Sequence, residues 1–292
     1  MSVLESALFN DDQFASLMRS PAESAKAIQA RLDMISPDIC HKVGPAALTT
    51  QNWLVYTDTA LGYLKNPEHG NVPDSLFTFM NYFPNGARIL DIGCGTGRDA
   101  MFMGTRDAQM RKNFMKRLKA GKDQVTRFGI PKKSFHTIGL DRAGPMLSCA
   151  TSIYGSFADD TGTSSLLWLE GDMHDLRTDR LQFFDGAWSS AALFMHTPRE
   201  YIAQSLCSVR DVLRNKGILG VSYINNPEGL PYDNLRYSRT GEIKYFSRPT
   251  ATEIIAEAER QGFSLILHEL SDLEMGGTVT KDFFITQFFQ KV

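Results

Sequence analysis

One stretch decides the fold of this chain: Arg88-Ile89-Leu90-Asp91-Ile92-Gly93-Cys94-Gly95-Thr96-Gly97-Arg98-Asp99-Ala100. An apolar segment that suits a β-strand leads into Asp91, and three glycines at alternate positions follow. Glycine lets the backbone turn tightly and approach a ligand closely. A helix that begins after Gly97 would aim its free N–H groups at the same point. The stretch therefore predicts a nucleotide-cofactor loop at the carboxyl end of a first parallel strand.

The spacing of the glycines separates the candidate cofactors. A dinucleotide fingerprint has the pattern G-x-G-x-x-G, whereas the third glycine here comes one residue early, at Gly97. The chain contains no G-x-x-x-x-G-K-[ST] pattern, which excludes a P-loop. Asp91 would repel a pyrophosphate but could pair with a cation. The stretch resembles motif I of the class I S-adenosylmethionine-dependent methyltransferases, whose cofactor carries a sulfonium and an ammonium.

Acidic residues mark the later predicted strands in the order that this resemblance requires. Asp141 ends the second strand, where a carboxylate can bind both ribose hydroxyls. Gly171, Asp172 and Met173 follow the third strand, where the Asp could accept from an adenine amino group and the Met could lie on the ring. Asp185 marks the fourth strand. Each signal is weak alone, because an Asp after a strand is more often a turn residue, but the ordered set favours a cofactor site.

Strand-like and helical runs alternate after the glycine loop. The strands are expected at 87–90, 135–140, 166–169, 183–189, 218–224, 263–268 and 283–289. This alternation predicts an α/β fold with a doubly wound, mostly parallel seven-stranded sheet, whose last two strands could form an antiparallel hairpin. Upstream, only helical spacing is present, and Pro37 predicts a helix end. We expect a helical N-terminal extension at 1–50 and a Rossmann-like methyltransferase domain at 51–292.

The resemblance extends beyond motif I. Residues 185–199 (DGAWSSAALFMHTPR) are similar to the segment after strand 4 in small bacterial class I methyltransferases of the methyltransferase 11/12/25 type. Tyr56 and Tyr63 are similar to aromatic residues of that group's N-terminal helix, which lie near the cofactor. The resemblance covers about residues 52–290. It implies further cofactor contacts within the motifs, from Cys94, Arg98, Arg142 and Ser189.

His196 is the candidate catalytic residue, because the resemblance places it just past the fourth strand on the substrate side. Methyl transfer by in-line displacement needs alignment more than acid–base help. A base is needed only for a protonated acceptor such as a hydroxyl. A histidine hydrogen-bonded at a strand–helix turn is an equally good interpretation. The other histidines show no metal-ligand spacing, so we predict no metal site.

A basic insertion, expected at about 105–134, separates the glycine loop from Asp141. Residues 106–133 carry ten Lys and Arg side chains against two Asp, so the segment has a charge of +8 and the rest of the chain −10. One interpretation is a solvated amphipathic helix whose long side chains cover apolar surface. The other is an electropositive wall that recruits an anionic substrate.

The composition of the whole chain excludes several classes of protein. A net charge of −2 over 292 residues shows no preference for nucleic acid or for a membrane surface. No apolar run reaches the ~18 residues that a membrane span needs. The four cysteines are scattered without a C-x-x-C pair, which suits a reducing compartment and favours the cytoplasm.

These patterns predict an S-adenosylmethionine-dependent methyltransferase that acts on a small-molecule acceptor. Three alternatives stay open: a nicotinamide-dependent oxidoreductase, a cofactor-binding regulatory pseudo-enzyme, and an RNA or protein methyltransferase recruited by the basic insertion. The early third glycine and Asp91 count against the first. The lack of an N/D-P-P-Y/F tetrad and of an RNA-binding module counts against nucleic acid. The acceptor and the oligomeric state stay open as well.

Overall fold

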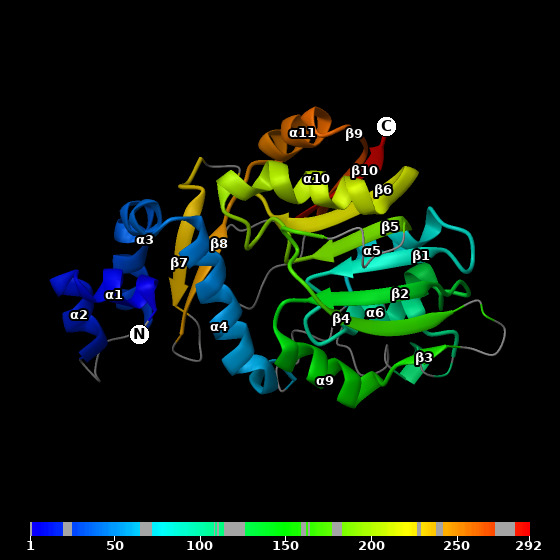
Figure 1. The fold of residues 1–292 in the computed structure, drawn as a ribbon, viewed down its shortest axis with the longest axis horizontal. Coiled ribbons are helices and arrows are strands. Elements are labelled where there is room, and N and C mark those ends of the chain that lie inside the picture. Colours follow the sequence, from blue (N-terminus) through cyan, green and yellow to red (C-terminus); the bar gives the residue numbers. More distant parts are fainter. Residues whose placement is uncertain are drawn as a thin grey trace.

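An eight-stranded sheet forms the centre of the molecule (Figure 1). The computed structural model describes residues 2–19, 25–64, 72–107, 109, 111–113, 126–158, 162, 164–176, 183–226, 229–237, 242–271 and 284–292. In spatial order the strands are β3 (Phe157–Ala158), β4 (Ser165–Glu170), β2 (His136–Asp141), β1 (Arg88–Ile92), β5 (Phe184–Ser190), β6 (Leu213–Ile224), β10 (Phe284–Lys291) and β9 (Phe263–Ser271).

Seven of these strands are the predicted ones, and β3 is an addition. It has two residues, too few to produce a sequence pattern, and pairs antiparallel with β4 at the sheet edge. From β4 across β2, β1 and β5 to β6 the strands run parallel. β10 runs antiparallel to both β6 and β9. The mostly parallel sheet with an antiparallel hairpin at its end is therefore confirmed.

Helices cover both faces of this sheet (Figure 1). Because neighbouring side chains of a strand point to opposite faces, Ile89 packs with α5 and α6 while Leu90 packs with α10 and α11. No helix among the described residues is long and apolar enough to cross a membrane. The helices are α1 (Val3–Phe9), α2 (Asp12–Arg19), α3 (Ala25–Val43), α4 (Pro45–Leu64), α5 (Asp74–Asn81), α6 (Arg98–Gly104), α9 (Gly144–Tyr154), α10 (Ile202–Val212) and α11 (Ala251–Arg260).

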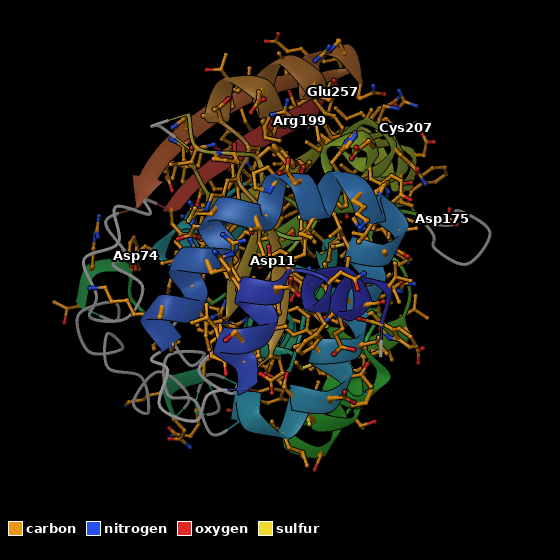
Figure 2. All side chains as sticks on the ribbon, turned by 90° about the vertical axis from the view of Figure 1, so that its left-hand side faces the viewer. Asp11, Asp74, Asp175, Arg199, Cys207 and Glu257 are labelled. Atoms are coloured by element: carbon orange, nitrogen blue, oxygen red, sulfur yellow. The ribbon has the colours of Figure 1, made fainter. Side chains whose placement is uncertain are left out.

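The N-terminal helices pack on a second sheet of two strands, β7 (Asp233–Tyr237) and β8 (Ile243–Ser247), inserted between β6 and α11. Seen from their side in Figure 2, the N-terminal helices lie in front of the rest of the molecule. Leu32 of α3 and Leu235 of β7 share one apolar cluster. The side chain of Gln29 accepts from the N–H of Tyr237 and donates to the carbonyl of Leu235, so α3 also completes the edge of β7.

Ion pairing and capping order the first helices. Asp11, at the front in Figure 2, accepts from the N–H of Phe14 at 2.7 Å and pairs with Arg31 of α3 at 2.5 Å. The hydrogen bond from Arg31 lowers the pKa of Asp11 more than any other contact does. The pair therefore ties the start of α2 to α3.

Pro37 lies inside α3, so the expected helix end at this residue is wrong. A proline within a helix removes one backbone hydrogen bond. The hydroxyl of its neighbour Ser36 donates to the carbonyl of Leu32 and accepts from the N–H of Leu235 in β7 at 3.0 Å. Tertiary contacts with the second sheet therefore carry the helix through a residue that would end it in isolation.

Only the two ends of the basic insertion belong to the described residues, and Lys116, Arg117, Lys119 and Lys122 lie outside them. Arg111 is buried and donates to the carbonyls of Phe102, Met103 and Pro131. Burial lowers the pKa of Arg111 to about 10. This residue is therefore a structural anchor beneath α6 rather than part of an electropositive surface.

The other described end of the insertion is fixed in the same way. Lys133 donates to the carbonyl of Phe83 at 2.8 Å, and the N–H of Gly86 donates to Ser134 at 2.8 Å. Arg127 pairs with Asp74 at the start of α5. These contacts lie where β1 and β2 begin, which is the sheet edge opposite the glycine loop. The described parts of the insertion therefore give no support to a wall beside the substrate.

Replacing Ser36 with alanine should destabilise the protein by about 1–3 kcal/mol, because the buried N–H of Leu235 loses its acceptor. The matched control is Ser148→Ala, whose exposed hydroxyl donates only to a carbonyl of its own helix. Urea unfolding followed by circular dichroism compares the two. Equal midpoints for both variants would contradict the described docking of α3 on β7.

Candidate functional site

The glycine loop joins β1 to α6, and its three glycines all have positive φ angles of 68°, 55° and 83°. A Cβ on Gly93 would lie 2.4 Å from the Cβ of Ala192, and one on Gly97 would lie 2.4 Å from the ring of Trp168. By contrast, a Cβ on Gly95 would meet no atom within 4 Å. The outer glycines therefore permit close packing, while Gly95 borders open space where a ligand can approach the backbone.

Asp91 lies at the base of this loop, on the central strand β1. Its side chain is buried, and its Oδ2 atom has no hydrogen-bond partner among the described residues. Burial raises the pKa of Asp91 well above its usual value; the carboxylate of Asp99 adds to the rise and Arg98 opposes it. A ligand cation that reached Oδ2 would satisfy this oxygen and lower the pKa again.

Two other predicted cofactor residues are Arg98, the first residue of α6, and Cys94 in the loop. Arg98 pairs with Asp99, with 2.6 Å between Nε and Oδ1, and the indole N–H of Trp188 donates to the same carboxylate at 2.9 Å. Burial raises the pKa of the Cys94 thiol. Arg98 therefore helps to hold Asp99 beneath the loop, and the loop itself carries the buried thiol of Cys94.

Asp141 ends β2 beside the glycine loop. Its Oδ2 accepts from the N–H of Gly95 at 2.9 Å, and its Oδ1 accepts from the N–H of Ala143 at 2.8 Å. Burial raises the pKa of Asp141, and these N–H donors partly oppose the rise. Since each carboxylate oxygen can accept more than one hydrogen bond, both could still receive ligand hydroxyls. The contact with the N–H of Gly95 brings Asp141, the residue predicted to bind the ribose, to the one of the three loop glycines that borders open space.

The predicted residues after β4 lie at the same edge of the sheet. Asp172 pairs with Arg142, with 3.5 Å between Oδ2 and Nη1, and the Arg142 guanidinium lies 5.6 Å from the ring centroid of Trp53 in α4. Met173 packs against the main apolar core. The N–H of Gly171 donates to the carbonyl that ends β2. Helix α4 therefore reaches the carboxyl ends of both β2 and β4.

Ser189 and Asp185 have structural contacts. The Ser189 hydroxyl donates to the carbonyl of Ile92 at 3.0 Å and accepts from the N–H of Leu193 at 3.0 Å. Asp185 lies near the start of β5, where it accepts from the N–H of Arg88 and pairs with Arg214. This is the edge opposite the glycine loop, so the interpretation of Asp185 as a cofactor marker is wrong.

His196 is buried in the turn after β5 and faces α4. Its Nε2 lies 2.9 Å from the hydroxyl of Tyr56, while its Nδ1 lies 3.2 Å from the amide nitrogen of Asn52 and 3.3 Å from the carbonyl of Tyr245. Burial lowers the pKa of His196 to about 4; the Tyr245 carbonyl opposes this and the charge of Lys244 adds to it. At neutral pH the imidazole is therefore uncharged.

Tyr63 follows Tyr56 by seven residues in α4, and its side chain lies outside the described part of the structure. Tyr56 is therefore the one of the two predicted tyrosines whose contacts are known.

No group of three or more His, Cys, Asp and Glu side chains that could hold a metal ion occurs among the described residues.

Sequence reasoning missed the contribution of Asn52 to this site. The Asn52 side chain accepts from the N–H of Tyr245 at 2.8 Å and donates to the carbonyl of the same residue at 2.9 Å. It therefore joins α4 to β8 directly beside His196. An asparagine at this position carries no motif, so only the fold reveals its role.

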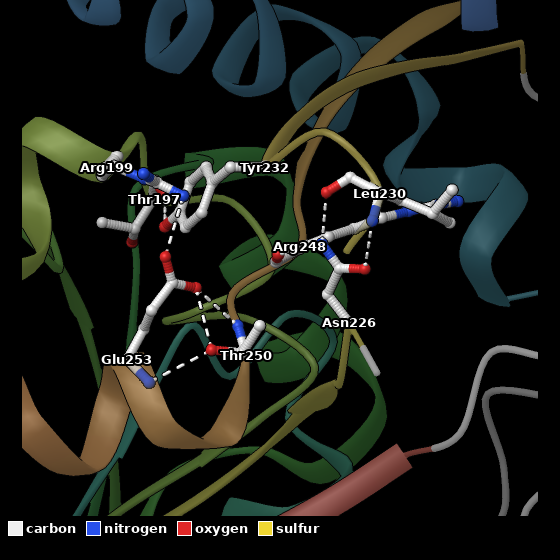
Figure 3. Close-up of polar contacts among 8 residues, drawn as sticks. All are labelled: Thr197, Arg199, Asn226, Leu230, Tyr232, Arg248, Thr250 and Glu253. Atoms are coloured by element: carbon white, nitrogen blue, oxygen red, sulfur yellow. Dashed lines mark hydrogen bonds and ion pairs between the residues drawn. The ribbon is translucent and has the colours of Figure 1, made fainter. Parts of the chain in front are cut away.

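Hydrogen bonds fix the two-stranded sheet of β7 and β8 (the small sheet) to the turn that carries His196. The N–H of Ser247 donates to the carbonyl of Met195 at 2.9 Å, and the hydroxyl of Tyr232 donates to the carbonyl of Thr197 at 2.9 Å. Figure 3 shows the same junction: Asn226 bonds to Leu230 and Arg248, and Arg199 pairs with Glu253 beside the cap residue Thr250 of α11. The turn and the small sheet therefore form one connected wall.

The pKa of His196 predicts how stability changes with pH. An unfolded imidazole takes up a proton near pH ~6.5, whereas His196 in the folded protein does so only near pH 4. The free energy of unfolding should therefore fall as the pH drops between these values, by up to about 3 kcal/mol from this residue. NMR titration of the ring, assigned with His196→Asn, gives the midpoint. A midpoint near 6.5 would contradict the buried position.

Neither a protein-family model nor a curated protein sequence matches this chain. Solved structures do match it. A TehB-like SAM-dependent methyltransferase from Corynebacterium glutamicum is 16% identical with a TM-score of 0.51, and the match covers 82% of this chain and 99% of the other. A SAM-dependent methyltransferase from Methanosarcina mazei is 16% identical with a TM-score of 0.53, over 74% and 97% of the two chains.

A third structure, a DhpI–SAH complex, is 14% identical with a TM-score of 0.54, over 84% of this chain and 97% of the other. All three comparisons concern the fold, since the identities are low. All three TM-scores lie just above 0.5, and each match covers nearly all of the other chain. The chain therefore has the fold of the class I S-adenosylmethionine-dependent methyltransferases, as its sequence motifs imply.

Proposed function

We propose that this protein is an S-adenosylmethionine-dependent methyltransferase that acts on a small-molecule acceptor. One observation carries the proposal: the loop with open space at Gly95 directly follows a buried carboxylate of β1, Asp91, whose Oδ2 has no partner among the described residues. Such a site suits a ligand with a cation. The pyrophosphate of NAD would instead bring negative charge toward a buried carboxylate in a region of low dielectric constant.

The residues around the loop fit the rest of that cofactor. Asp141 would receive the ribose hydroxyls, Asp172 the adenine amino group, and Met173 would lie against the adenine ring. The Asp91 carboxylate would hold the cationic end. Tyr56 would form the wall on the side of α4.

The chemistry that S-adenosylmethionine supplies when bound is a methyl group on a positively charged sulfur. The protein then has to align the acceptor with that methyl group and exclude water. For a hydroxyl acceptor, the uncharged His196 could hold the departing proton at Nε2, which contacts the Tyr56 hydroxyl. For an unprotonated nitrogen acceptor, the same residues would serve only to position it.

The position of α4 supports a small acceptor. Asn52 and Tyr56 join α4 to the His196 turn and to β8, so the acceptor side of the site is bounded by three tied elements. A large acceptor would have to separate them.

The described ends of the basic insertion lie at the opposite edge of the sheet and do not support recruitment of RNA or protein. A measured rate of methyl transfer from S-adenosylmethionine would distinguish a methyltransferase from a regulatory pseudo-enzyme that only binds the cofactor.

Calorimetry tests the proposed cofactor. The protein should bind S-adenosylmethionine and S-adenosylhomocysteine with micromolar Kd, and NAD and ATP without measurable heat. Gly95→Ala should abolish the cofactor signal, because its methyl group would project into the open space. Gly44→Ala is the matched control, since Gly44 also has a positive φ of 76° and open space around a Cβ, at the junction of α3 and α4.

Both glycine variants carry the same backbone strain, of about 1–2 kcal/mol. A selective loss of binding in Gly95→Ala would therefore reflect the ligand site rather than reduced stability. Tight binding of NAD, or equal cofactor affinity in both variants, would contradict the proposal. Screening of metabolite pools with methyl-labelled cofactor would then identify the acceptor.

A further inference from the structure

The contacts of His196 decide which of its ring nitrogens carries the proton. An uncharged imidazole holds one proton, so one nitrogen donates a hydrogen bond and the other accepts one. His196 is uncharged at neutral pH, because burial lowers its pKa to about 4 and the neighbouring Lys244 and His174 act in the same direction. Its Nδ1 faces Asn52 and its Nε2 faces Tyr56. A partner that can only donate therefore fixes the tautomer.

Asn52 is the partner whose orientation is settled by other contacts. Its carboxamide oxygen accepts from the N–H of Tyr245 at 2.8 Å, and its carboxamide nitrogen donates to the carbonyl of the same residue at 2.9 Å. Exchanging the two atoms would set oxygen against oxygen and donor against donor, so these bonds exclude the flipped carboxamide. The atom 3.2 Å from Nδ1 of His196 is therefore an amide nitrogen, which donates and cannot accept.

Only the tautomer with the proton on Nε2 satisfies all of these groups. In it, Nδ1 accepts from the Asn52 amide, and Nε2–H donates to the oxygen of Tyr56 at 2.9 Å. In the other tautomer, Nδ1–H would face the amide donor of Asn52. It would also share the Tyr245 carbonyl, 3.3 Å away, with the shorter bond from Asn52. Since Asn52 and His196 are both buried, a donor left without an acceptor there is costly.

This tautomer prevents His196 from acting as a base. Nε2, the nitrogen next to the Tyr56 hydroxyl, already holds the proton, and the lone pair of Nδ1 is directed at Asn52 of α4. The proposed function allows two kinds of acceptor, a hydroxyl that loses a proton and an uncharged nitrogen. Only the hydroxyl needs a base. The nitrogen has its lone pair available without one, so the tautomer favours the nitrogen.

We propose that Asn52 is a positioning residue that holds His196 in the Nε2–H tautomer, and that the acceptor atom is a nitrogen uncharged at neutral pH. The nitrogen lone pair forms the new N–C bond to the methyl carbon while the S–C bond breaks. The electron pair of the broken bond stays on sulfur, which becomes a neutral thioether, and the positive charge passes to the nitrogen. A hydrogen on that nitrogen is lost to water afterwards.

The acceptor class rests on the proposed function, whereas the tautomer and the role of Asn52 do not. Long-range ¹H–¹⁵N correlation NMR of the full-length protein at pH 7 tests the tautomer, and spectra of His196→Asn identify the His196 signals. We expect a protonated Nε2 and an unprotonated Nδ1. A proton on Nδ1, or a charged imidazole at this pH, would overturn the proposal.

The variant Asn52→Asp tests the role of Asn52, because it replaces the donor nitrogen with an oxygen that can only accept. The proton of His196 should move to Nδ1, and the midpoint of the ring titration should rise by about 1–3 pH units, since a carboxylate favours the charged imidazole. An unchanged tautomer in the folded variant would contradict the role of Asn52. If the variant does not fold, the wild-type spectra decide.

Asn226→Asp is the matched control. Asn226 is also buried, and its carboxamide also accepts from one backbone N–H and donates to backbone carbonyls, but its partners are Leu230 and Arg248 instead of His196. The same chemical change should therefore leave the His196 tautomer and midpoint as in the wild type. A shift as large as that in Asn52→Asp would mean that the effect is not specific to Asn52 and would overturn its role.

The position of the transferred methyl group tests the acceptor class. After incubation of metabolite pools with methyl-labelled S-adenosylmethionine, NMR of the labelled product should place the methyl group on nitrogen. A label on a hydroxyl oxygen, or on any other atom, would overturn the acceptor class. The Nε2–H tautomer without methyl transfer would refute the proposed function and leave the role of Asn52 standing. Methyl transfer by a protein with the proton on Nδ1 would do the reverse.

Discussion

The constraint on which this structure depends is the burial of a carboxylate at the end of the central strand. Asp91 lies between β2 and β5 with one oxygen that has no partner among the described residues, an arrangement that costs stability unless something satisfies it. The glycine loop directly above leaves open space at Gly95 and none at Gly93 or Gly97. Backbone with positive φ angles, a buried carboxylate and open space at Gly95 therefore occur together at the position where we propose that the ligand binds.

The rest of the fold holds this position from two sides. The parallel strands bring Asp141 and Asp172 to the same edge, as the carboxyl ends of neighbouring strands must. The other side is built by parts that are far apart in sequence: α4, the turn with His196, and β8, joined through Asn52 and Tyr56. The N-terminal helices share an apolar cluster with β7 and β8, so the extension supports the sheet that packs beside His196 although it lies far from the glycine loop in sequence.

The glycine loop and the positions of Asp141 and Asp172 at the carboxyl ends of their strands could be predicted from sequence, because a strand, a glycine loop and terminal Asp residues are local signals. The packing of α4 against the His196 turn and β8 could not. β7 and β8 are short and their outward face carries Arg236 and Lys244, which weakens the apolar alternation that marks a strand. Pro37 was misleading because Ser36 and β7 support the helix through tertiary contacts. Arg111 was misleading as part of an electropositive surface, because its guanidinium donates to three backbone carbonyls. No sequence pattern reveals such contacts.

A crystal structure of the protein with S-adenosylhomocysteine tests the central claim most directly. The account predicts that the ammonium of the ligand contacts the Asp91 carboxylate, directly or through one water. It also predicts that the ribose hydroxyls of the ligand bind Asp141 and that the ligand packs against the backbone of Gly95. The occupied loop should keep the three positive φ angles seen without ligand. A ligand bound elsewhere, or one that leaves the Asp91 carboxylate without any new partner, would contradict the account.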